Sequence, residues 1–157
     1  MNGAVPIRVL LVDDHPMVRE GLRAMLHTDP ELVVVGEAAS GVEARRLVAE
    51  QAPAVVLLDI QMPGEDGLHI ARWVKTRHPA VKVVVVSNYD YAPLIVEAIA
   101  VGASGYLLKD CSRSLLCHTV HAVTSGAVLF QEELLRRAIR RVGQVDREAA
   151  LRVATLT

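Results

Sequence analysis

A short apolar run that ends in a carboxylate limits the possible folds of this chain more than any other stretch. Residues 55–58 are Val-Val-Leu-Leu, Asp59 follows directly, and Pro63-Gly64 breaks the chain soon afterwards. A continuous apolar run between turn signals is typical of a strand that is buried on both faces, as in a parallel sheet. Because a buried carboxylate without a partner is costly, we expect Asp59 at the rim of the sheet, where open α/β sheets bind ligands. A helix cap or a turn is the common alternative for an aspartate that follows a strand.

Similar apolar runs alternate with helical periodicity along the chain. The predicted strands are residues 7–12, 32–35, 55–58, 81–86 and 106–108, and the predicted helices occupy the intervals between them and 112–124. Pro16 suits the first turn of a helix, and Ser40 with Glu43 has the spacing of a capping box. The helix over 93–101 is expected to bury Leu94, Ile95, Ala98 and Ile99. Alternating strands and helices predict a parallel sheet with helices on both faces and right-handed crossovers.

Composition excludes several classes of protein. The chain has 157 residues, 52% of them apolar, which is enough for one globular domain and an appendage. A net charge of −1 and 3% aromatic residues argue against a nucleic-acid-binding surface in this piece. Two cysteines are too few for a disulfide framework and fit a reduced, cytoplasmic setting. No apolar run approaches membrane-spanning length, and no leader peptide is expected at the N-terminus.

Polar side chains gather at the predicted strand ends. They are Asp13 and Asp14 after the first strand, Asp59 after the third, Ser87 after the fourth and Lys109 after the fifth. All belong to the same edge of a parallel sheet. Two carboxylates about 4 Å apart repel by about 1 kcal/mol in water and about 4 kcal/mol near a protein surface, which a divalent cation would relieve. Oxygen ligands select a hard ion such as Mg²⁺, which orients a phosphoryl group for attack by a carboxylate. An ammonium and a hydroxyl can hold the transferred oxygens.

Over about residues 6–125 the chain resembles the receiver domain of bacterial two-component response regulators. The matching motifs are Leu11-Val12-Asp13-Asp14-His15-Pro16, Leu58-Asp59-Ile60-Gln61-Met62-Pro63-Gly64-Glu65-Asp66-Gly67, Ser87 and Gly105-Tyr106-Leu107-Leu108-Lys109-Asp110. The resemblance implies a flavodoxin-like (CheY-like), doubly wound sheet of five parallel strands in the order 2-1-3-4-5, with helices on both faces.

The resemblance also implies a role for each strand-end residue. Asp59 would be the phosphoacceptor. Asp14 and Asp59 would give carboxylates to Mg²⁺ (or Mn²⁺), Asp13 would act mainly through water, and the carbonyl of Gln61 would complete the metal site. Ser87 and Tyr106 match the switch pair, the two residues that respond to the phosphoryl group in this family. Lys109 matches the invariant lysine of the family. Tyr106 could instead be ordinary strand core.

The run from Gly102 to Asp110 is similar to the NarL/LuxR class, in which a linker leads to a helix-turn-helix DNA-binding domain. We therefore expect a receiver domain over 1–125 and a linker over 126–157, with a helix at about 131–142 whose apolar side is Leu134, Leu135, Ala138 and Ile139. Such a protein accepts phosphate from a sensor histidine kinase, catalyses only its own phosphotransfer and dephosphorylation, and pairs as a homodimer when phosphorylated. It reaches DNA only through the C-terminal domain, which often begins with Leu-Thr, as at 156–157.

Departures from the family pattern keep other functions open. Ser87 replaces the commoner threonine, and Asn88 is bulkier than the usual next residue, which would restrict access to the phosphoryl group. A degenerate receiver that acts as an interaction module without phosphorylation is one alternative. A phosphohydrolase with an aspartyl nucleophile is another, although Gln61 stands where its second aspartate would be. A flavin carrier would need a glycine- and hydroxyl-rich loop in place of Asp13-Asp14. His118 and His121 are expected to form an exposed or partner-facing stripe rather than a metal site, and the arginines from 136 to 141 are expected to be solvated.

Overall fold

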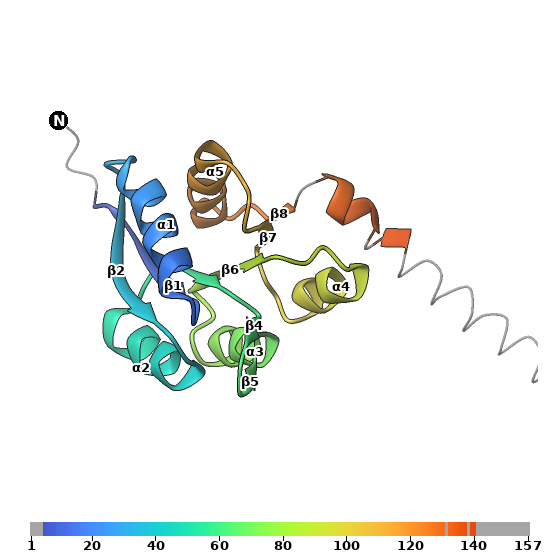
Figure 1. Cartoon of the computed structure of the whole chain (residues 1–157), viewed down its shortest axis with the longest axis horizontal. Helices are drawn as coiled ribbons and strands as arrows, with labels where there is room; N and C mark the ends of the chain where they lie inside the picture. Colours follow the sequence, from blue (N-terminus) through green and yellow to red (C-terminus); the bar gives the residue numbers. More distant parts are fainter. Residues whose placement is uncertain (1–4, 131, 138, 141–157) are drawn as a thin grey trace, which may run out of the picture.

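The structure, a computed structural model, describes residues 5–130, 132–137 and 139–140 and contains the predicted parallel sheet with helices on both faces (Figure 1). The strands of the main sheet are β1 (Ile7–Val12), β2 (Leu32–Ala38), β3 (Val55–Leu58), β6 (Lys82–Ser87), β7 (Gly105–Leu108) and β8 (Leu129–Phe130). All neighbours are parallel, and their order is β2-β1-β3-β6-β7-β8. The first five of these strands have the predicted order 2-1-3-4-5.

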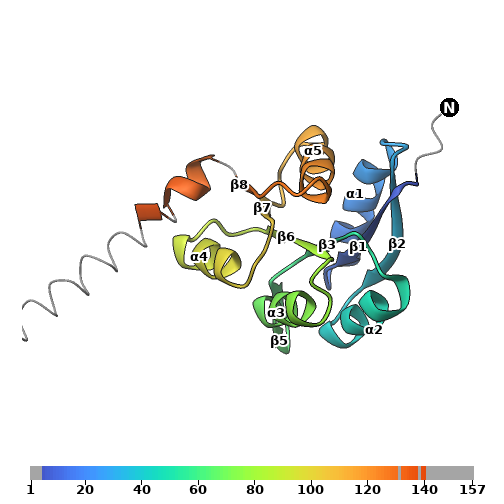
Figure 2. The ribbon, with the colours of Figure 1, turned by 180° about the vertical axis from the view of Figure 1, so that it is seen from behind.

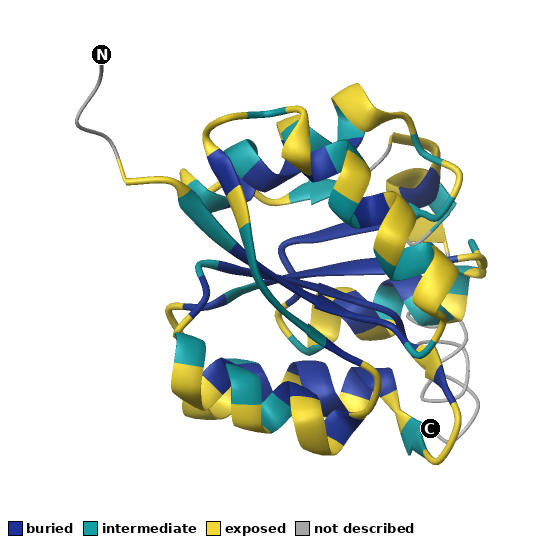
Figure 3. Cartoon of the chain, turned by 60° about the vertical axis from the view of Figure 1, so that its left-hand side comes forward, coloured by how far each residue is buried: buried dark blue, intermediate teal, exposed yellow. Residues whose placement is uncertain are grey.

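Five helices cover the sheet in two layers. They are α1 (Pro16–His27), α2 (Gly41–Gln51), α3 (Gly67–Arg77), α4 (Ala92–Ala100) and α5 (Arg113–Thr124). Helices α1 and α5 lie on one face, and α2, α3 and α4 lie on the other (Figures 1 and 2). Their outer surfaces are exposed, while the central strands between the layers are largely buried (Figure 3). Among the described residues, no helix is both long and apolar enough to cross a bilayer.

The alternation of side chains along each strand builds the two halves of the core. In β1, Val9 and Leu11 pack with α1 and α5, whereas Leu10 and Val12 pack with α2 and α3. Successive side chains of a strand point to opposite faces, so an unbroken apolar run serves both layers. The residues of β3 are buried on both faces for the same reason.

The predicted helix starts are confirmed, with one change in the capping box. Pro16 stands in the first turn of α1. The Oγ of Ser40 accepts the N–H of Glu43 at 3.2 Å. The Glu43 carboxylate, however, accepts the N–H of Ala39 at 2.8 Å rather than that of Ser40. The cap therefore also ties down the residue that precedes it.

The structure differs from the prediction in its number of strands. The loop after Asp59 contains a short antiparallel hairpin, β4 (Gln61–Met62) and β5 (Glu65–Asp66), closed by Gly64 with a φ of 86°. Two-residue strands are too short to leave a periodic signal. Strand β8 adds to the edge of the sheet beside β7. Strand β2 ends at Ala38 rather than at residue 35, because a register shift opposite Val9 and Leu10 carries its pairing past Gly36.

Three apolar residues that we expected on buried helix faces are exposed. Ile99 is 42% exposed, and Leu135 and Ile139 are 38% and 62% exposed. Only a narrow stripe of α4, centred on Ile95 and Ala98, contacts the sheet.

The end of the described chain touches the sheet. Residues 132–137 and 139–140 are helical, and Leu134 is buried beside β7 and α4. The remainder of the helix predicted at about 131–142, with Ala138, lies outside the described residues. The division between a receiver over 1–125 and a linker over 126–157 stays a prediction.

Candidate functional site

The sheet brings the predicted strand-end residues to one edge. Main-chain hydrogen bonds continue the ladder one residue beyond each strand: the N–H of Asp13 donates to Ala38, that of Asp59 to Val12 at 2.8 Å, and that of Lys109 to Ser87 at 2.9 Å. The side chains that follow the apolar runs therefore start from fixed backbone positions at neighbouring strand ends.

The ammonium of Lys109 lies between two buried carboxylates. Its Nζ is 2.9 Å from Asp13 Oδ2 and 3.2 Å from Asp59 Oδ2. Asp13 and Asp59 are each 1% exposed. The contact with Asp59 has the geometry of a hydrogen bond. The contact with Asp13 is an ion pair without hydrogen-bond geometry. Lys109 thus offsets part of the negative charge without satisfying every oxygen.

Burial and charge shift the pKa values of this pair. Burial raises the pKa of the Asp59 carboxyl, and the charge of Asp13 adds to the rise, although the N–H of Gln61 and the ammonium of Lys109 oppose it. Burial alone would lower the pKa of Lys109, but its close contact with Asp13 and the negative charges of Asp59 and Asp13 raise it overall. The carboxylate of Asp59 is therefore held in a less favourable environment than water, whereas Lys109 stays charged.

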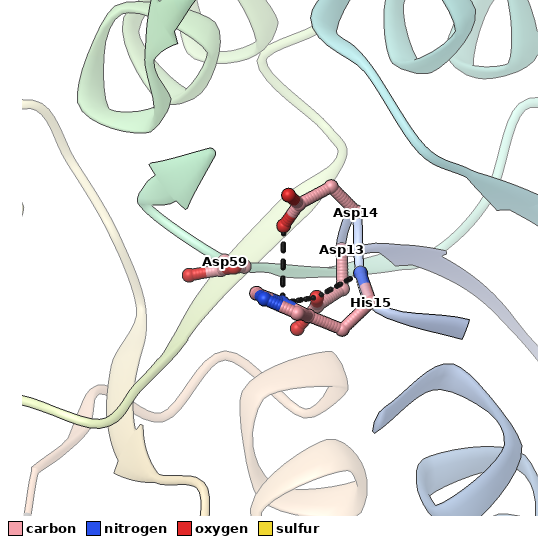
Figure 4. Close-up of side chains that lie close together, drawn as sticks. All are labelled: Asp13, Asp14, His15 and Asp59. Carbon is pink, nitrogen blue, oxygen red and sulfur yellow. Dashed lines mark hydrogen bonds and ion pairs between the residues drawn. The ribbon is translucent and has the colours of Figure 1, made fainter. Parts of the chain in front are cut away.

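His15 joins the carboxylates, although it is not among the site residues predicted from the sequence (Figure 4). Its Nδ1 lies 3.0 Å from Asp13 Oδ1 and 3.1 Å from Asp14 Oδ1, and its N–H donates to Asp13 Oδ1 at 2.8 Å. The side chain is 58% exposed. His15 directly follows the two aspartates in the sequence, and this adjacency is the only signal that could have indicated its place.

The donor set of this cluster fits a hard divalent cation. Ligand atoms of Asp13, Asp14, His15 and Asp59 lie within 4.8 Å of one another. Among the described residues, the buried side-chain oxygens without a hydrogen-bond partner are Asp13 Oδ2 and Asp14 Oδ1. Unsatisfied carboxylate oxygens at one edge are the ligands that Mg²⁺ prefers.

Gln61 contributes through its backbone. Its N–H donates to Asp59 Oδ1 at 2.9 Å, whereas the residue itself is exposed in β4. This bond fixes one carboxylate oxygen of Asp59 on the side away from Lys109. The predicted role of the Gln61 carbonyl as a metal ligand stays a prediction.

Both residues of the predicted switch pair form hydrogen bonds with the backbone of Tyr89. Ser87 and Tyr106 are both buried, with 0% exposure. Ser87 Oγ accepts the N–H of Tyr89 at 3.0 Å, and the hydroxyl of Tyr106 donates to the carbonyl of Tyr89 at 2.6 Å. Burial raises the pKa of the Tyr106 phenol. Tyr106 is thus both a core residue and a hydrogen-bond partner of the loop after β6.

Asn88 lies in that loop and is exposed. It lines a hollow of about 250 Å³ together with His15, Val18 and Lys109, on the α1 side of the acidic cluster. Asn88 therefore borders the approach to the site from α1.

A second cluster of acidic residues and a histidine lies between the α1–β2 loop and α5. His121 Nε2 is 2.8 Å from Asp29 Oδ2, and its Nδ1 is 3.7 Å from Glu31 Oε2. His118 is exposed, as expected for an exposed or partner-facing stripe, whereas His121 is half-buried against Asp29, a long-range contact that leaves no trace in a local pattern.

The sheet order and the acidic edge define an α/β protein with a cluster of carboxylates beyond its strand ends that fits a cation. The model of the response regulator receiver domain family matches residues 9–121. The chain belongs to this family.

Named relatives support the same class. The chain is 40% identical over 130 residues to the transcriptional regulatory protein YdfI of Bacillus subtilis, with 83% of this chain and 61% of the relative covered. It is 34% identical over 134 residues to the nitrate/nitrite response regulator protein NarL of Escherichia coli K12, covering 85% and 62%. The DNA-binding transcriptional activator DevR/DosR of Mycobacterium tuberculosis is 39% identical over 124 residues, covering 79% and 57%. The chain thus spans about three fifths of the length of these relatives.

Solved structures agree with the sequence relatives. A two-component response regulator of the LuxR family from Aurantimonas sp. SI85-9A1 superposes with a TM-score of 0.81 at 30% identity, covering 87% of this chain and 97% of that one. The response regulator ChrA of a heme-sensing two-component system gives 0.73 at 36% identity, covering 89% and 67%. The chain therefore contains a receiver domain of the kind found in NarL/LuxR-type response regulators.

Proposed function

We propose that this chain is a Mg²⁺-dependent phosphoacceptor that receives a phosphoryl group on Asp59 from the phosphohistidine of a sensor kinase in the cytoplasm. The observation that carries the proposal is the Asp59 carboxylate, which lies at a strand end within 3.2 Å of the Lys109 ammonium and beside two more carboxylates. Such a carboxylate can act as a nucleophile when fixed donors hold the transferred oxygens.

In the proposed step, a carboxylate oxygen of Asp59 attacks phosphorus, and a P–O bond forms as the P–N bond of phosphohistidine breaks. The electron pair of that bond leaves with the imidazole, which takes a proton. The N–H of Gln61 holds Asp59 Oδ1 during this step, and Lys109 is in place to pair with a phosphoryl oxygen. Asp13, Asp14 and Asp59 would hold Mg²⁺ with the Gln61 carbonyl, and the bound ion would neutralise phosphoryl oxygens and orient them in line.

The route from the site to an output runs through the loop after β6. A phosphoryl oxygen that accepts the Ser87 hydroxyl proton would pull Ser87 Oγ toward the site, and this oxygen also accepts the N–H of Tyr89. Tyr106 holds the carbonyl of the same residue, and Arg137 of the C-terminal helical segment pairs with Asp90 next to it. Movement of this loop would therefore reach both the α4–β7 surface and the segment that follows β8, biasing two states.

The remaining parts of the proposal follow the relatives. The phosphorylated chain would pair as a homodimer, and a DNA-binding domain beyond the linker would carry the transcriptional output. The protein would be a signalling switch, with catalysis limited to its own phosphotransfer and dephosphorylation.

Intact-mass spectrometry after treatment with acetyl phosphate and Mg²⁺ tests the proposal. The parent should gain about 80 Da, as expected for one phosphoryl group. Asp59→Asn should gain nothing, whereas Asp29→Asn, which changes an aspartate in the second cluster, should be labelled like the parent. Excess chelator should block labelling. An unchanged parent mass would support the degenerate receiver instead.

Light scattering with beryllofluoride tests the output. The parent should shift toward a dimer, and Arg137→Gln should alter this shift while Asp59 is labelled as before. An identical shift in both proteins would exclude Arg137 from the route.

A further inference from the structure

A side chain of α2 binds the β4–β5 hairpin that follows Asp59. The two terminal guanidinium nitrogens of Arg45, in α2, donate to the carboxylate of Glu65 in β5, and the Nη1–Oε1 contact is 2.8 Å. Each side chain of this pair is 28% exposed. A two-point guanidinium–carboxylate contact fixes orientation as well as distance, which a single point charge does not.

Two neighbouring residues position the Arg45–Glu65 pair. Its guanidinium lies 5.8 Å from the ring centroid of Trp73 in α3. Glu65 fits against α2 because residue 41 is glycine: a Cβ there would stand 2.0 Å from Glu65 Oε1. The Glu65 carboxylate thus approaches the N-terminal turn of α2, where the helix dipole favours a negative charge. These contacts lower the pKa of Glu65, chiefly through its hydrogen bond to Arg45.

The β4–β5 hairpin connects Glu65 to the acidic site. In its antiparallel register, Met62 pairs with Glu65, and Gln61 pairs with Asp66. The N–H of Gln61 holds Asp59 Oδ1, and Met62 is buried under the α2 and α3 layer. The far end of the loop is also fixed, since Gly67 leaves no room for a Cβ, which would lie 2.7 Å from the carbonyl of Asp59. The peptide of Gln61 is therefore bound to Asp59 on one side and paired on the other with Asp66, the residue next to Glu65 in β5.

We propose that Arg45 is a positioning residue for the metal and phosphoacceptor site, acting through Glu65 and the β4–β5 hairpin on the backbone of Gln61. This inference rests on the proposed function. The Arg45–Glu65 contact sets where the Gln61 peptide stands relative to Asp59, and so sets the affinity of the site for a divalent cation.

Opposite charge changes separate positioning from a general electrostatic effect. Arg45→Gln removes a positive charge near the acidic cluster, so electrostatics alone would tighten cation binding. Glu65→Gln removes a negative charge, so electrostatics alone would weaken it. Positioning predicts that both variants bind more weakly. Loss of a partner that orients a metal ligand typically reduces affinity by about 10- to 100-fold, and we expect at least about threefold here, one residue further out.

The experiment measures Mn²⁺ binding by the loss of the free-ion EPR signal, with acetyl phosphate labelling in parallel. Arg46→Gln is the matched control, because Arg46 is the next residue of α2 and pairs only with Glu50 on the exposed face among the described contacts. It should bind Mn²⁺ like the parent. Amide exchange should speed up at residues 61–66 in Arg45→Gln and Glu65→Gln but not in the control. The exchanged pair Arg45→Glu/Glu65→Arg should recover much of the parent affinity.

The result that would overturn the inference is parent-like Mn²⁺ affinity in folded Arg45→Gln and Glu65→Gln, or weaker binding in one and tighter binding in the other. If Arg45→Gln does not fold, Arg45→Lys, which keeps the charge but not the two-point contact, takes its place and should show the same weakening. A parent that binds Mn²⁺ but is never labelled would contradict the proposed function while leaving the positioning result to stand by itself.

Discussion

The two acidic clusters of this molecule contain similar residues and have opposite energetics. At the carboxyl edge of the sheet, Asp59 is buried beside other carboxylates, and burial raises its pKa. At the amino edge, Asp29 accepts the N–H of Glu31 at 2.9 Å and faces His121 at 2.8 Å, and these hydrogen bonds lower its pKa. One cluster keeps unsatisfied oxygens while the other satisfies its own. The difference shows that burial and unfilled hydrogen-bonding capacity, rather than residue type, make a site that can take a ligand.

The largest expected effect comes from removing the ammonium group of Lys109 at the carboxyl edge of the sheet. Lys109→Met should lower the free energy of unfolding by about 3 kcal/mol at pH 7 without divalent cations, because Asp13 and Asp59 would remain buried without their counter-charge. The deficit should shrink as acid protonates the carboxylates. Urea titrations from pH 4 to 8 measure it, and equal stability at pH 7 would contradict this account of the cluster.

Adding a divalent cation should stabilise one cluster and not the other. At a Mg²⁺ concentration ten times its Kd, the parent should gain about 1.4 kcal/mol. Asp14→Asn should lose most of this gain, since Asp14 Oδ1 is one of the unsatisfied oxygens. Asp29→Asn should keep it, and chelator should abolish it in every variant. Thermal unfolding with and without Mg²⁺ provides the comparison. An equal gain in Asp14→Asn would place the ion elsewhere.

Neutralising Asp59, the proposed phosphoacceptor, should stabilise the fold. A raised folded-state pKa means that Asp59 costs stability as pH rises from its unfolded value of 3.8 through its folded value. Asp59→Asn should therefore be more stable than the parent by about 1 kcal/mol at pH 7, from the relief of desolvation. The gain should vanish below pH 3.8. Paired urea titrations at pH 7 and pH 3.5 test this, and a less stable variant at pH 7 would reverse the sign assigned to Asp59.

The same change at the other cluster should have the opposite and smaller effect. Because the folded-state pKa of Asp29 is lowered, its contribution is present above the unfolded value of 3.8 and is lost as pH falls through the folded value. Asp29→Asn should lower stability by about 0.5 kcal/mol at pH 7, since the pair with His121 is partly exposed. His118→Gln, on the exposed side of α5, is the control and should change nothing.

Much of the site follows from local sequence, because its residues stand directly after strands. The apolar runs ending at Val12 and Leu58 fixed the predicted strands, and parallel topology then placed Asp13 and Asp59 at one edge. Ser40 was predictable as a cap because its partner is three residues away. Where an interaction is encoded within a few residues, pattern is a sufficient guide.

The rest depends on contacts between distant segments. Arg45 and Glu65 are twenty residues apart, and His121 and Asp29 are separated by most of the domain. Neither pair belongs to a periodic pattern, so no sequence rule brings the partners together. Ile99 was misplaced for a related reason: helical periodicity identifies an apolar stripe, but the width of the neighbouring surface decides how much of it is covered.

Strand β8 also affects the tendency of the chain to aggregate. By pairing with β7, it occupies main-chain groups that would otherwise form an open edge, the kind of surface on which unrelated chains add strands and aggregate. Only two residue pairs hold it, Leu129 with Gly105 and Phe130 with Tyr106. A state in which β8 separated from β7 would leave the main-chain groups of β7 open to such pairing. The short strand thus protects part of the β7 edge against aggregation.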